Sequence, residues 1–186
     1  MKQMRQLQKN RKIREVDVSA LKILYYGDPR LREVCSSVDE ATDPAVRSLV
    51  ERMFELMFAA HGVGLAGSQV GVMVRLFVAS PTFAEDDRRV YINPRIVSMS
   101  GAQDGEEGCL SFPNITCKVK RAKVVTICAV NLDGEKFEET GEGLTARIFQ
   151  HESEHLDGRL LVDRMGSVAK LANRRVLKEL QSGLPR

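Results

Sequence analysis

The sequence has no stretch that approaches the roughly 18 uninterrupted apolar residues of a membrane-spanning helix. Its N-terminus also lacks the apolar core of a secretory signal. The four cysteines lie at irregular spacings, at positions 35, 109, 117 and 128, which is not the framework of a disulfide-stabilised secreted domain. With 186 residues, of which 43% are hydrophobic, the chain is long enough to bury one core. We therefore expect one soluble domain in a reducing, cytoplasmic environment.

Acidic residues are missing from the first 14 positions, which carry six basic side chains: Lys2, Arg5, Lys9, Arg11, Lys12 and Arg14. Of the 28 basic residues, 22 remain for the rest of the chain, against 25 acidic ones, so the body has a net charge of −3. We interpret residues 1–20 as a basic, solvated N-terminal arm. An organelle transit peptide is a weaker alternative because such segments are rich in serine, and this arm has none before Ser19. Non-specific contact with RNA is another weak alternative.

A helix is predicted over Asp43 to His61. Asp43 is a typical N-cap residue, Pro44 suits the first helical position, and Gly62 is placed to end the helix. Between them, apolar residues recur at helical spacing, at positions 46, 49, 50, 53, 56 and 57. Strands are predicted where β-branched and apolar residues gather, over Val72 to Ala79, Val90 to Val97 and Ile115 to Val130. A turn at Asn131 to Gly134 should lead into a short return strand.

Two more helices are predicted towards the C-terminus. The first runs from Gly143 to Leu156, and Gly158 is placed to end it. The second, over Val168 to Leu180, alternates apolar and basic residues as an amphipathic closing helix does. Strands around one buried helix, with further helices outside, predict an α+β domain, and we assign the closing segment 166–186 to that same domain.

The chain has only three histidines, and two of them, His151 and His155, lie four residues apart in the predicted helix. This spacing puts both imidazoles on one face, where they can bind one metal ion, and brings Glu152 within reach of a water on that ion. The alternative is an exposed polar turn of helix. Apolar residues on either side of the motif favour a half-buried metal site instead.

A catalytic metal site normally has three protein ligands and one open position, so a third ligand must come from elsewhere. No histidine follows His155, which excludes the protease pattern with a third histidine. Cys109 is the better candidate because a thiolate is a strong ligand for iron or zinc and the adjacent Gly108 lets the backbone bend tightly. Glu179 is the alternative, as in another type of zinc protease.

The segment Gly62 to Gly71 is rich in glycine, but it follows a predicted helix and lacks the Lys-Ser/Thr pair of a phosphate-binding loop. Nucleotide binding is therefore disfavoured. Its glycines allow an open backbone beside a ligand, and Gln69 offers an amide donor. Taken alone, the segment would be a structural turn.

Three segments, in this order, resemble the peptide deformylase family: Gly62 to Gln69, Glu107 to Ser111 and Gln150 to Gly158. The stretches 24–32 and 119–122 are also similar to the family, and the likeness extends from about Leu21 to Met165. It implies a peptide deformylase-like fold, with mixed and antiparallel strands surrounding a central metal-binding helix, and a catalytic domain over residues 21–165.

The resemblance also implies an activity, the removal of the N-formyl group from the N-terminal formylmethionine of nascent polypeptides. The metal would be Fe(II), with nickel, cobalt or zinc as replacements. By position, Cys109, His151 and His155 would hold it. Glu152 would take a proton from the metal-bound water that attacks the formyl carbon, and then protonate the departing amine.

Further roles follow from the same resemblance. Gln69 and the backbone N–H of Leu110 would stabilise the oxyanion, Gly64 would offer backbone hydrogen bonds to the peptide, and Arg121 would line the groove. Arg147 departs from the family, which generally has an apolar residue there in the pocket for the first substrate side chain. We expect Arg147 either to pair with an acid, such as 142 or 106 in the numbering of this chain, or to shift preference away from methionine.

Two other functions remain as alternatives: a zinc metalloprotease that uses Glu179, and a non-catalytic deformylase-like protein associated with the ribosome. A purely structural metal does not require an acid–base glutamate, which disfavours the second. The resemblance implies action on formylated nascent peptides in the bacterial cytoplasm, an organelle being less favoured. The basic closing helix is compatible with contact to ribosomal RNA, and we expect no membrane partner and no sequence-specific nucleic acid.

Overall fold

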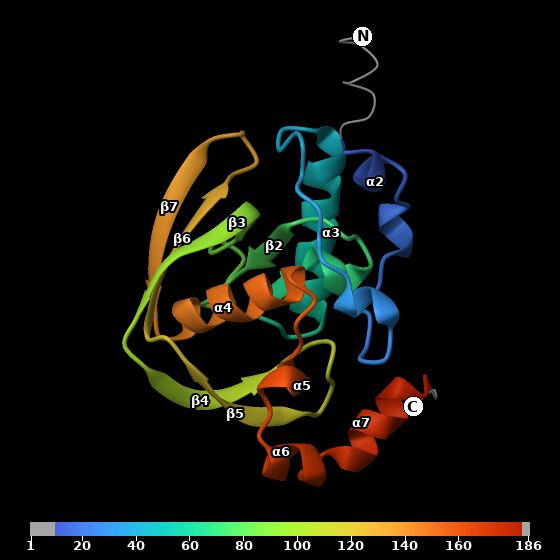
Figure 1. The fold of residues 1–186 in the computed structure, drawn as a ribbon. Helices are drawn as coiled ribbons and strands as arrows, with labels where there is room; N and C mark the ends of the chain where they lie inside the picture. The colour runs from blue at the N-terminus through green and yellow to red at the C-terminus, as the bar shows by residue number, and fades with distance from the viewer. Residues whose placement is uncertain (1–9, 184–186) are drawn as a thin grey trace.

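Helix α4 (Leu144–Leu156) lies at the centre of the fold, with strands on two sides of it (Figure 1). The structure is a computed structural model and describes residues 10–183. The strands are β1 (Gly64–Ala66), β2 (Leu76–Ala79), β3 (Arg89–Ser100), β4 (Gln103–Gly108), β5 (Thr116–Arg121), β6 (Val124–Val130) and β7 (Lys136–Glu142). The other helices are α2 (Arg11–Arg14), α3 (Pro44–Ala59), α5 (Leu161–Arg164), α6 (Ser167–Ala172) and α7 (Arg174–Gln181), with 3-10 turns η1 (Val18–Ala20), η2 (Pro29–Arg32) and η3 (Gly67–Val70). The predicted α+β fold with strands around a central helix is confirmed.

The strands form two antiparallel sheets. Five strands make the larger sheet in the order β1-β2-β3-β6-β7, and β4 pairs with β5 in a separate sheet. Because β3 runs on into β4 and β5 runs on into β6, one long bent hairpin contributes to both sheets (Figure 1). The two sheets therefore enclose α4 from different sides.

The bend between β5 and β6 corrects the prediction of one strand over Ile115 to Val130. At the bend, the backbone N–H of Ala122 donates to the Gln150 side chain at 3.0 Å, and its carbonyl accepts from Gln103 at 3.0 Å. Side chains from α4 and β4 thus satisfy the backbone where the sheet ladder stops. This arrangement lets the chain cross from one sheet to the other.

One face of α4 is packed onto the larger sheet through aromatic rings. Phe149 meets Tyr91 edge to face at 5.2 Å between ring centroids, and Tyr91 stacks on Phe77 at 4.6 Å. All three rings are fully buried. Losing a buried ring of this kind typically costs about 3–5 kcal/mol, so this contact fixes the position of the helix and of the polar residues on its other faces.

Helix α3 agrees closely with its prediction. The Asp43 carboxylate caps its N-terminus by accepting from the N–H of Ala45 at 3.0 Å, and the N–H of Gly62 bonds to the Met57 carbonyl just beyond its end. Its buried side chains include five of the six predicted apolar positions, the exception being Leu56. The hairpin turn before β7 is likewise confirmed.

Other boundaries differ from expectation. The predicted strand from Val72 begins only at Leu76, because Gly71 adopts a left-handed φ of 80° and the backbone stays irregular after it. The short strand β1 and the polar strand β4 were not predicted, since neither shows an alternation of apolar residues. The predicted strand over Val90 to Val97 extends to the bounds of β3.

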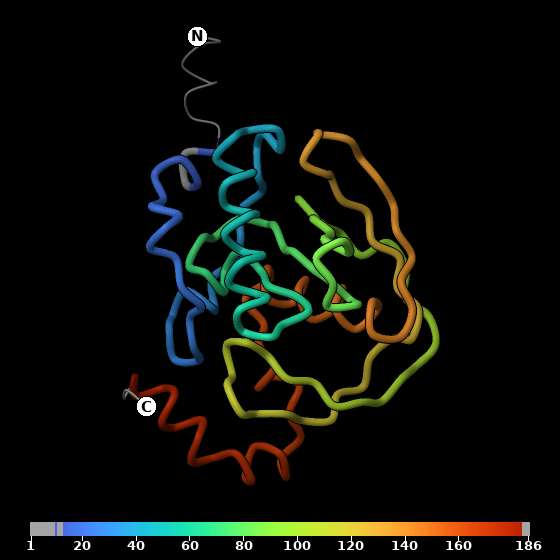
Figure 2. The backbone as a smooth tube through the Cα atoms, turned by 180° about the vertical axis from the view of Figure 1, so that it is seen from behind, coloured from blue at the N-terminus to red at the C-terminus, as the bar shows by residue number. Residues whose placement is uncertain are grey.

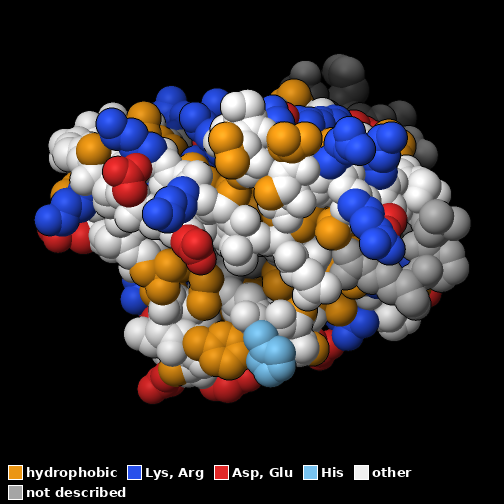
Figure 3. All heavy atoms as spheres, turned by 90° about the horizontal axis from the view of Figure 1, so that it is seen from below, with side chains coloured by type: hydrophobic (Ala, Val, Ile, Leu, Met, Phe, Trp, Pro, Cys, Tyr) orange, Lys and Arg blue, Asp and Glu red, His pale blue; other side chains and the backbone are white. Residues whose placement is uncertain are grey.

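The closing segment is two helices rather than one, with a break at Asn173 (Figure 2). Leu177 is buried on α7, whereas Val168 and Leu171 on α6 are 81% and 70% exposed. The predicted amphipathic face is therefore packed only over α7. The face seen in Figure 3 carries exposed hydrophobic side chains beside Lys and Arg side chains. Among residues 10–183, no helix has both the length and the apolarity to cross a membrane.

The N-terminal arm is docked from Asn10 onwards, which corrects its interpretation as a solvated tail. Asn10 is buried and donates to the Glu40 carbonyl at 2.6 Å, while its side-chain oxygen accepts from the N–H of Asp39 at 2.9 Å. Ile13 is 3% exposed and belongs to the core around α3. Lys2, Arg5 and Lys9 lie outside the described residues.

Replacing Asn10 by Ala is expected to lower the free energy of unfolding by about 1–3 kcal/mol, because it leaves buried backbone groups at residues 39 and 40 without partners. Urea denaturation measures this. Ser19→Ala is the control, since the Ser19 hydroxyl bonds to the exposed carboxylate of Asp17. Equal effects of the two substitutions would show that the arm does not depend on this anchor.

Candidate metal centre

A thiol and two imidazoles converge between α4 and the end of β4. The Cys109 Sγ lies 3.2 Å from His155 Nε2, which lies 3.2 Å from His151 Nε2. All three atoms are within 4.8 Å of one another. The two histidines are one helical turn apart, whereas Cys109 is 46 residues from His155 and reaches it because the β4–β5 sheet covers this face of α4.

The orientation of His151 is fixed by a buried carboxylate. Its Nδ1 lies 3.1 Å from Glu107 Oε2, which leaves Nε2 directed at the other two ligands. Glu107 also accepts two bonds from Arg121, at 2.8 and 2.9 Å, and one from Arg147 at 2.7 Å. Burial alone would raise the pKa of Glu107, but the hydrogen bonds from Arg121 and His151 outweigh it and lower the pKa below its ordinary value. The carboxylate therefore stays ionised.

The ion network continues behind Arg121. Its Nη1 donates to Glu154 at 2.8 Å, and Glu154 also accepts from Arg164, at 2.9 Å from Nε. Burial would raise the pKa of Glu154, but the bonds from Arg164 and Arg121 lower it overall. His151, Glu107, Arg121, Glu154 and Arg164 thus form one continuous chain of hydrogen bonds from the metal ligands to the opposite side of α4.

Glu152 is the acidic group nearest the ligands on α4 that has no arginine partner. It is 4% exposed, and its Oε2 has no hydrogen-bond partner among the described residues. Burial, the largest cause, raises the pKa of Glu152 to about 7, with the charge of Glu107 adding to the effect and those of His151 and Arg121 opposing it. A carboxyl group with this pKa can both accept and release a proton near neutral pH.

Gln69 is held rigidly beside the thiol. Its side-chain oxygen accepts from the N–H of Ala66 at 2.8 Å, and its Nε2 lies 3.1 Å from the Ser111 hydroxyl and 3.5 Å from Cys109 Sγ. The amide donors therefore point at the cluster. A cavity of about 540 Å³ opens above it, lined among others by Gln69, Gly64 and Leu110.

The donor set suits a divalent transition metal. In a tetrahedral zinc site, ligand atoms at 2.0–2.3 Å from the ion lie about 3.3–3.6 Å apart, close to the separations found here. Burial, reinforced by the charge of His151, lowers the pKa of His155 well below its ordinary value and keeps it neutral. Burial would also lower the pKa of His151, but the neighbouring Cys109 and Glu107 raise it. A cation would take the place of that proton between the thiolate and the imidazoles.

Comparison with known proteins agrees with this geometry. The model of the polypeptide deformylase family matches residues 20–171. The chain belongs to this family. A curated peptide deformylase from Acidobacterium capsulatum is 46% identical over 164 residues, which cover 87% of this chain and 96% of the relative.

Solved deformylase structures share the fold. A crystal structure of peptide deformylase from Plasmodium falciparum has a TM-score of 0.84 and 37% identity, and covers 87% of this chain and 96% of its own. The structure of a peptide deformylase from Legionella pneumophila has a TM-score of 0.81 and 42% identity, with 88% and 98% covered.

Most residues that the sequence singled out in this deformylase lie around one point. Cys109, His151 and His155 form the cluster, and Glu152, Gly64, Leu110 and Gln69 line the adjoining cavity. Glu179, the alternative third ligand, is not part of the cluster: it lies on α7 and pairs with Arg175 at 2.8 Å.

Two arginines lie elsewhere than expected. Arg121 is 4% exposed and enclosed by Glu107 and Glu154, and it is not among the residues that line the cavity, so its prediction as a groove residue is corrected. Arg147 does line the cavity and does pair with an acid, but the acid is Glu107 and neither Glu142 nor Glu106. Its aliphatic part borders the pocket while its charge is neutralised behind it.

Sequence reasoning did not single out Glu107 as a functional residue. It was quoted only as the start of the segment around Cys109, although its place two residues before a candidate ligand on a strand puts both side chains on the same face. Glu154 was also missed as a partner of Arg121. Both acids act through the orientation of other side chains, which no local pattern reveals.

The substitution Glu107→Gln is expected to weaken metal affinity about 10–100-fold, because His151 loses the anionic acceptor that orients it. It also leaves two buried guanidinium groups without their shared anion, which costs about 3–5 kcal/mol of stability. Competition with a chelator and denaturant unfolding measure the two effects. The neighbouring Glu106→Gln, at an exposed side chain, is the control and should change neither. Unchanged metal affinity in Glu107→Gln would contradict the orienting role.

The stability of the metal-free protein is expected to depend on pH through Glu152. Since its folded pKa of about 7 exceeds the ordinary value of 4.5, its contribution is full below pH 4.5 and is lost as the pH rises through 7. The variant Glu152→Gln should therefore gain stability over the wild type between pH 4.5 and 7, by on the order of 3 kcal/mol. Urea unfolding at several pH values tests this; a difference that stays constant would argue against a buried, neutral carboxyl group.

Proposed function

We propose that Cys109, His151 and His155 hold one divalent metal ion, and that Glu152 moves the proton, in the reaction that this deformylase catalyses. The reaction is hydrolysis of the N-formyl group from the N-terminal methionine of nascent peptides. The observation that carries the proposal is the convergence of one thiol and two imidazoles from separate segments beside a buried carboxyl group without an arginine partner.

The metal supplies Lewis acidity, which lowers the pKa of a water and polarises a carbonyl group. We propose Fe(II) as the ion, with nickel, cobalt or zinc as substitutes, because a mixed set of one thiolate and two imidazoles accepts all of them. Each imidazole binds through Nε2. Glu107 holds the first ring by its Nδ1, so the ligand need not reorganise when the ion enters.

Glu152 acts as the general base and then as the general acid. Its Oε2 is free of protein partners, so it can accept a proton from the attacking water and return it to the amine that leaves. A pKa near 7 suits both directions of transfer at neutral pH. The absence of an arginine contact on this carboxyl group, in contrast to Glu107 and Glu154, keeps its pKa from being lowered.

Gln69 and the backbone N–H of Leu110 stabilise the oxyanion that forms on the formyl carbon. The Gln69 amide is fixed by Ala66 and Ser111, so no reorganisation is needed when charge develops. Gly64 lies on β1, which is an edge strand of the larger sheet and lines the cavity. Its backbone offers hydrogen bonds to an extended peptide.

The wider assignments are also part of the proposal. We assign residues 21–165 to the catalytic domain and the closing helices to the same domain, because Leu177 packs in a core cluster with Leu24 and Leu31. The location proposed is the bacterial cytoplasm. The basic side chains of α6 and α7 are compatible with contact to the ribosome, where formylated peptides emerge.

The experiment compares Glu152→Ala with the wild type, both purified without oxygen, by metal analysis and by turnover of a formyl-Met peptide. Turnover should fall by about 10²–10⁴-fold with the metal retained, because the ligands are intact and only the proton carrier is lost. Glu106→Gln, which borders the same cavity, is the matched control and should keep its activity. Full activity in Glu152→Ala would refute the assignment of the proton carrier.

A second variant separates the deformylase site from the protease alternative. Cys109→Ala should lose the metal, whereas Glu179→Ala should retain it, because only the first residue belongs to the cluster. The opposite result would favour the carboxylate ligand of a zinc protease.

A further inference from the structure

A second cavity lies on the side of α4 away from the metal ligands. Its volume is about 320 Å³, and it shares no lining residue with the cavity above Cys109. From α4 it receives Gln150, Ser153 and Glu154, whereas the first cavity receives residues 147, 148, 151 and 152. The helical period thus divides α4 between two separate chambers.

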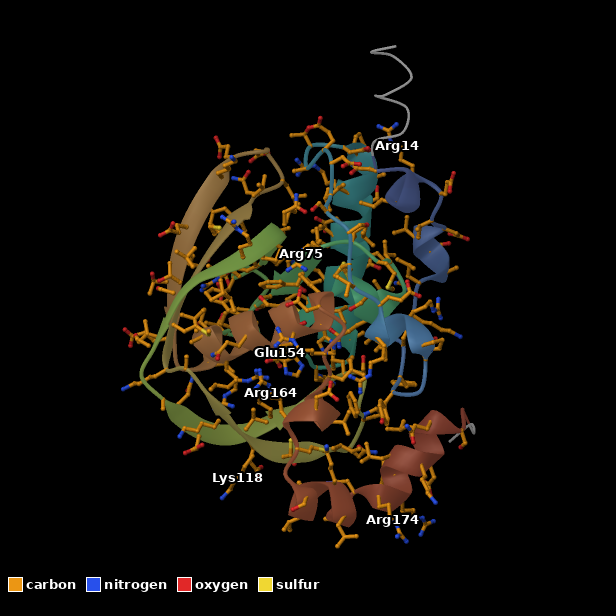
Figure 4. The ribbon with its side chains drawn as sticks, in the orientation of Figure 1. Arg14, Arg75, Lys118, Glu154, Arg164 and Arg174 are labelled. Carbon is orange, nitrogen blue, oxygen red and sulfur yellow. The ribbon has the colours of Figure 1, made fainter. Side chains whose placement is uncertain are left out.

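Positive charge is in excess in this second cavity. Four of its lining residues are arginines, Arg75, Arg95, Arg159 and Arg164, and two are acids, Glu154 and Asp157, which leaves two positive charges. Figure 4 shows Arg75 and Arg164 on opposite sides of Glu154. Asp157 accepts from two of these arginines, Arg75 at 2.8 Å and Arg159 at 3.1 Å.

Arg95 differs from the other three arginines. It is exposed on β3, and its only described polar contact is a weak one of 4.0 Å to the Cys128 sulfur; within residues 10–183 it has no carboxylate partner. A guanidinium group presents several N–H donors in a planar fork that matches the oxygens of a phosphate or carboxylate. Arg95 is therefore available to bind an anion in the cavity.

An independent observation comes from Ser153. This side chain lines the cavity and is 8% exposed, and its hydroxyl has no hydrogen-bond partner among the described residues. Buried hydroxyl groups in folded proteins nearly always have a partner, and leaving one without costs free energy. A ligand oxygen in the cavity would supply the missing partner.

The rest of the lining defines the ligand further. Pro94, Ile96 and Met99 form an apolar wall on β3, and the cavity is larger than one phosphate group requires. The charge excess of two matches a phosphate monoester, which is close to a dianion above pH 6, better than a single carboxylate. Apolar surface beside it would cover a short aliphatic or aromatic group on the ester.

We propose that this cavity is a binding site for a small phosphate ester, with Arg95 and Ser153 binding the phosphate group and the apolar wall of β3 covering its organic part. The site is distinct from the one that acts on formylated peptides. Because Arg164 and Glu154 continue through Arg121 to Glu107, it also adjoins the network that orients His151.

The test is isothermal titration calorimetry of the full chain loaded with zinc, at pH 8 and constant ionic strength, with inorganic phosphate and with phenyl phosphate. One saturable site per chain is expected, with phenyl phosphate binding at least threefold more tightly than phosphate. Binding that does not saturate would overturn the proposal. Equal affinities would overturn the role of the apolar wall.

Variants locate the site. Arg95→Gln and Ser153→Ala should each weaken phenyl phosphate binding at least fivefold, because each removes a donor to the phosphate group. Arg174→Gln removes the same charge from α7, far from the cavity in Figure 4, and should leave binding unchanged. Equal weakening by Arg95→Gln and Arg174→Gln would indicate general charge attraction, and no weakening by either cavity variant would place the ligand at the metal centre; both results overturn the proposal.

Thermal melting without ligand checks the fold of both variants. Arg95 is exposed and Ser153 loses a hydroxyl that has no protein partner, so neither substitution should lower the melting temperature by more than a few degrees. Deformylase turnover of the same variants, measured without phosphate, is expected to stay within twofold of the wild type. Retained turnover with lost phosphate binding separates this site from the proposed reaction.

Discussion

The carboxylate of Glu107 is the group on which the metal centre depends. It is 5% exposed and is bonded to His151, Arg121 and Arg147 at the same time. An ionised group at such a position is stable only because three partners offset the loss of water around it. Its geometry in turn sets which nitrogen of His151 faces the ligand cluster, so one buried charge links the β4–β5 sheet to α4.

This constraint explains why the helix that carries the ligands is polar and still central. The aromatic contact of Phe149 with Tyr91 supplies the burial, and the remaining faces carry charges that are satisfied in pairs or networks. Only Glu152 lacks such a partner, and its pKa is raised as a result. The contrast between satisfied and unsatisfied carboxyl groups on one helix distinguishes positioning from proton transfer.

Local patterns in the sequence predicted much of this arrangement. Helix α3 and helix α4 were expected within two residues of their ends, because caps, glycine stops and apolar spacing are local signals. The grouping of Cys109 with the two histidines followed from ligand chemistry and from the family resemblance. These features depend on residues close in sequence or on a motif of fixed spacing.

The parts that were missed depend on contacts distant in sequence. Nothing near Ile115 indicates that the chain bends at Ala122, since the bend is stabilised by Gln150 from α4. Likewise Arg121 was expected at a groove because its charge suggested exposure, whereas two acids from other elements enclose it. Docking of Asn10 on the loop before α3 is another long-range contact without a local signal.

Gly64 carries one more consequence. A methyl group in place of its hydrogen would lie 2.5 Å from Glu152 Oε1, so β1 and α4 approach each other with no room for a side chain between them. What a bound chain meets there is main-chain amide and carbonyl, which are the same in every polypeptide. An enzyme that reads its substrate through such a surface is indifferent to most of the residues that follow the first, as a processor of many different newly made proteins must be.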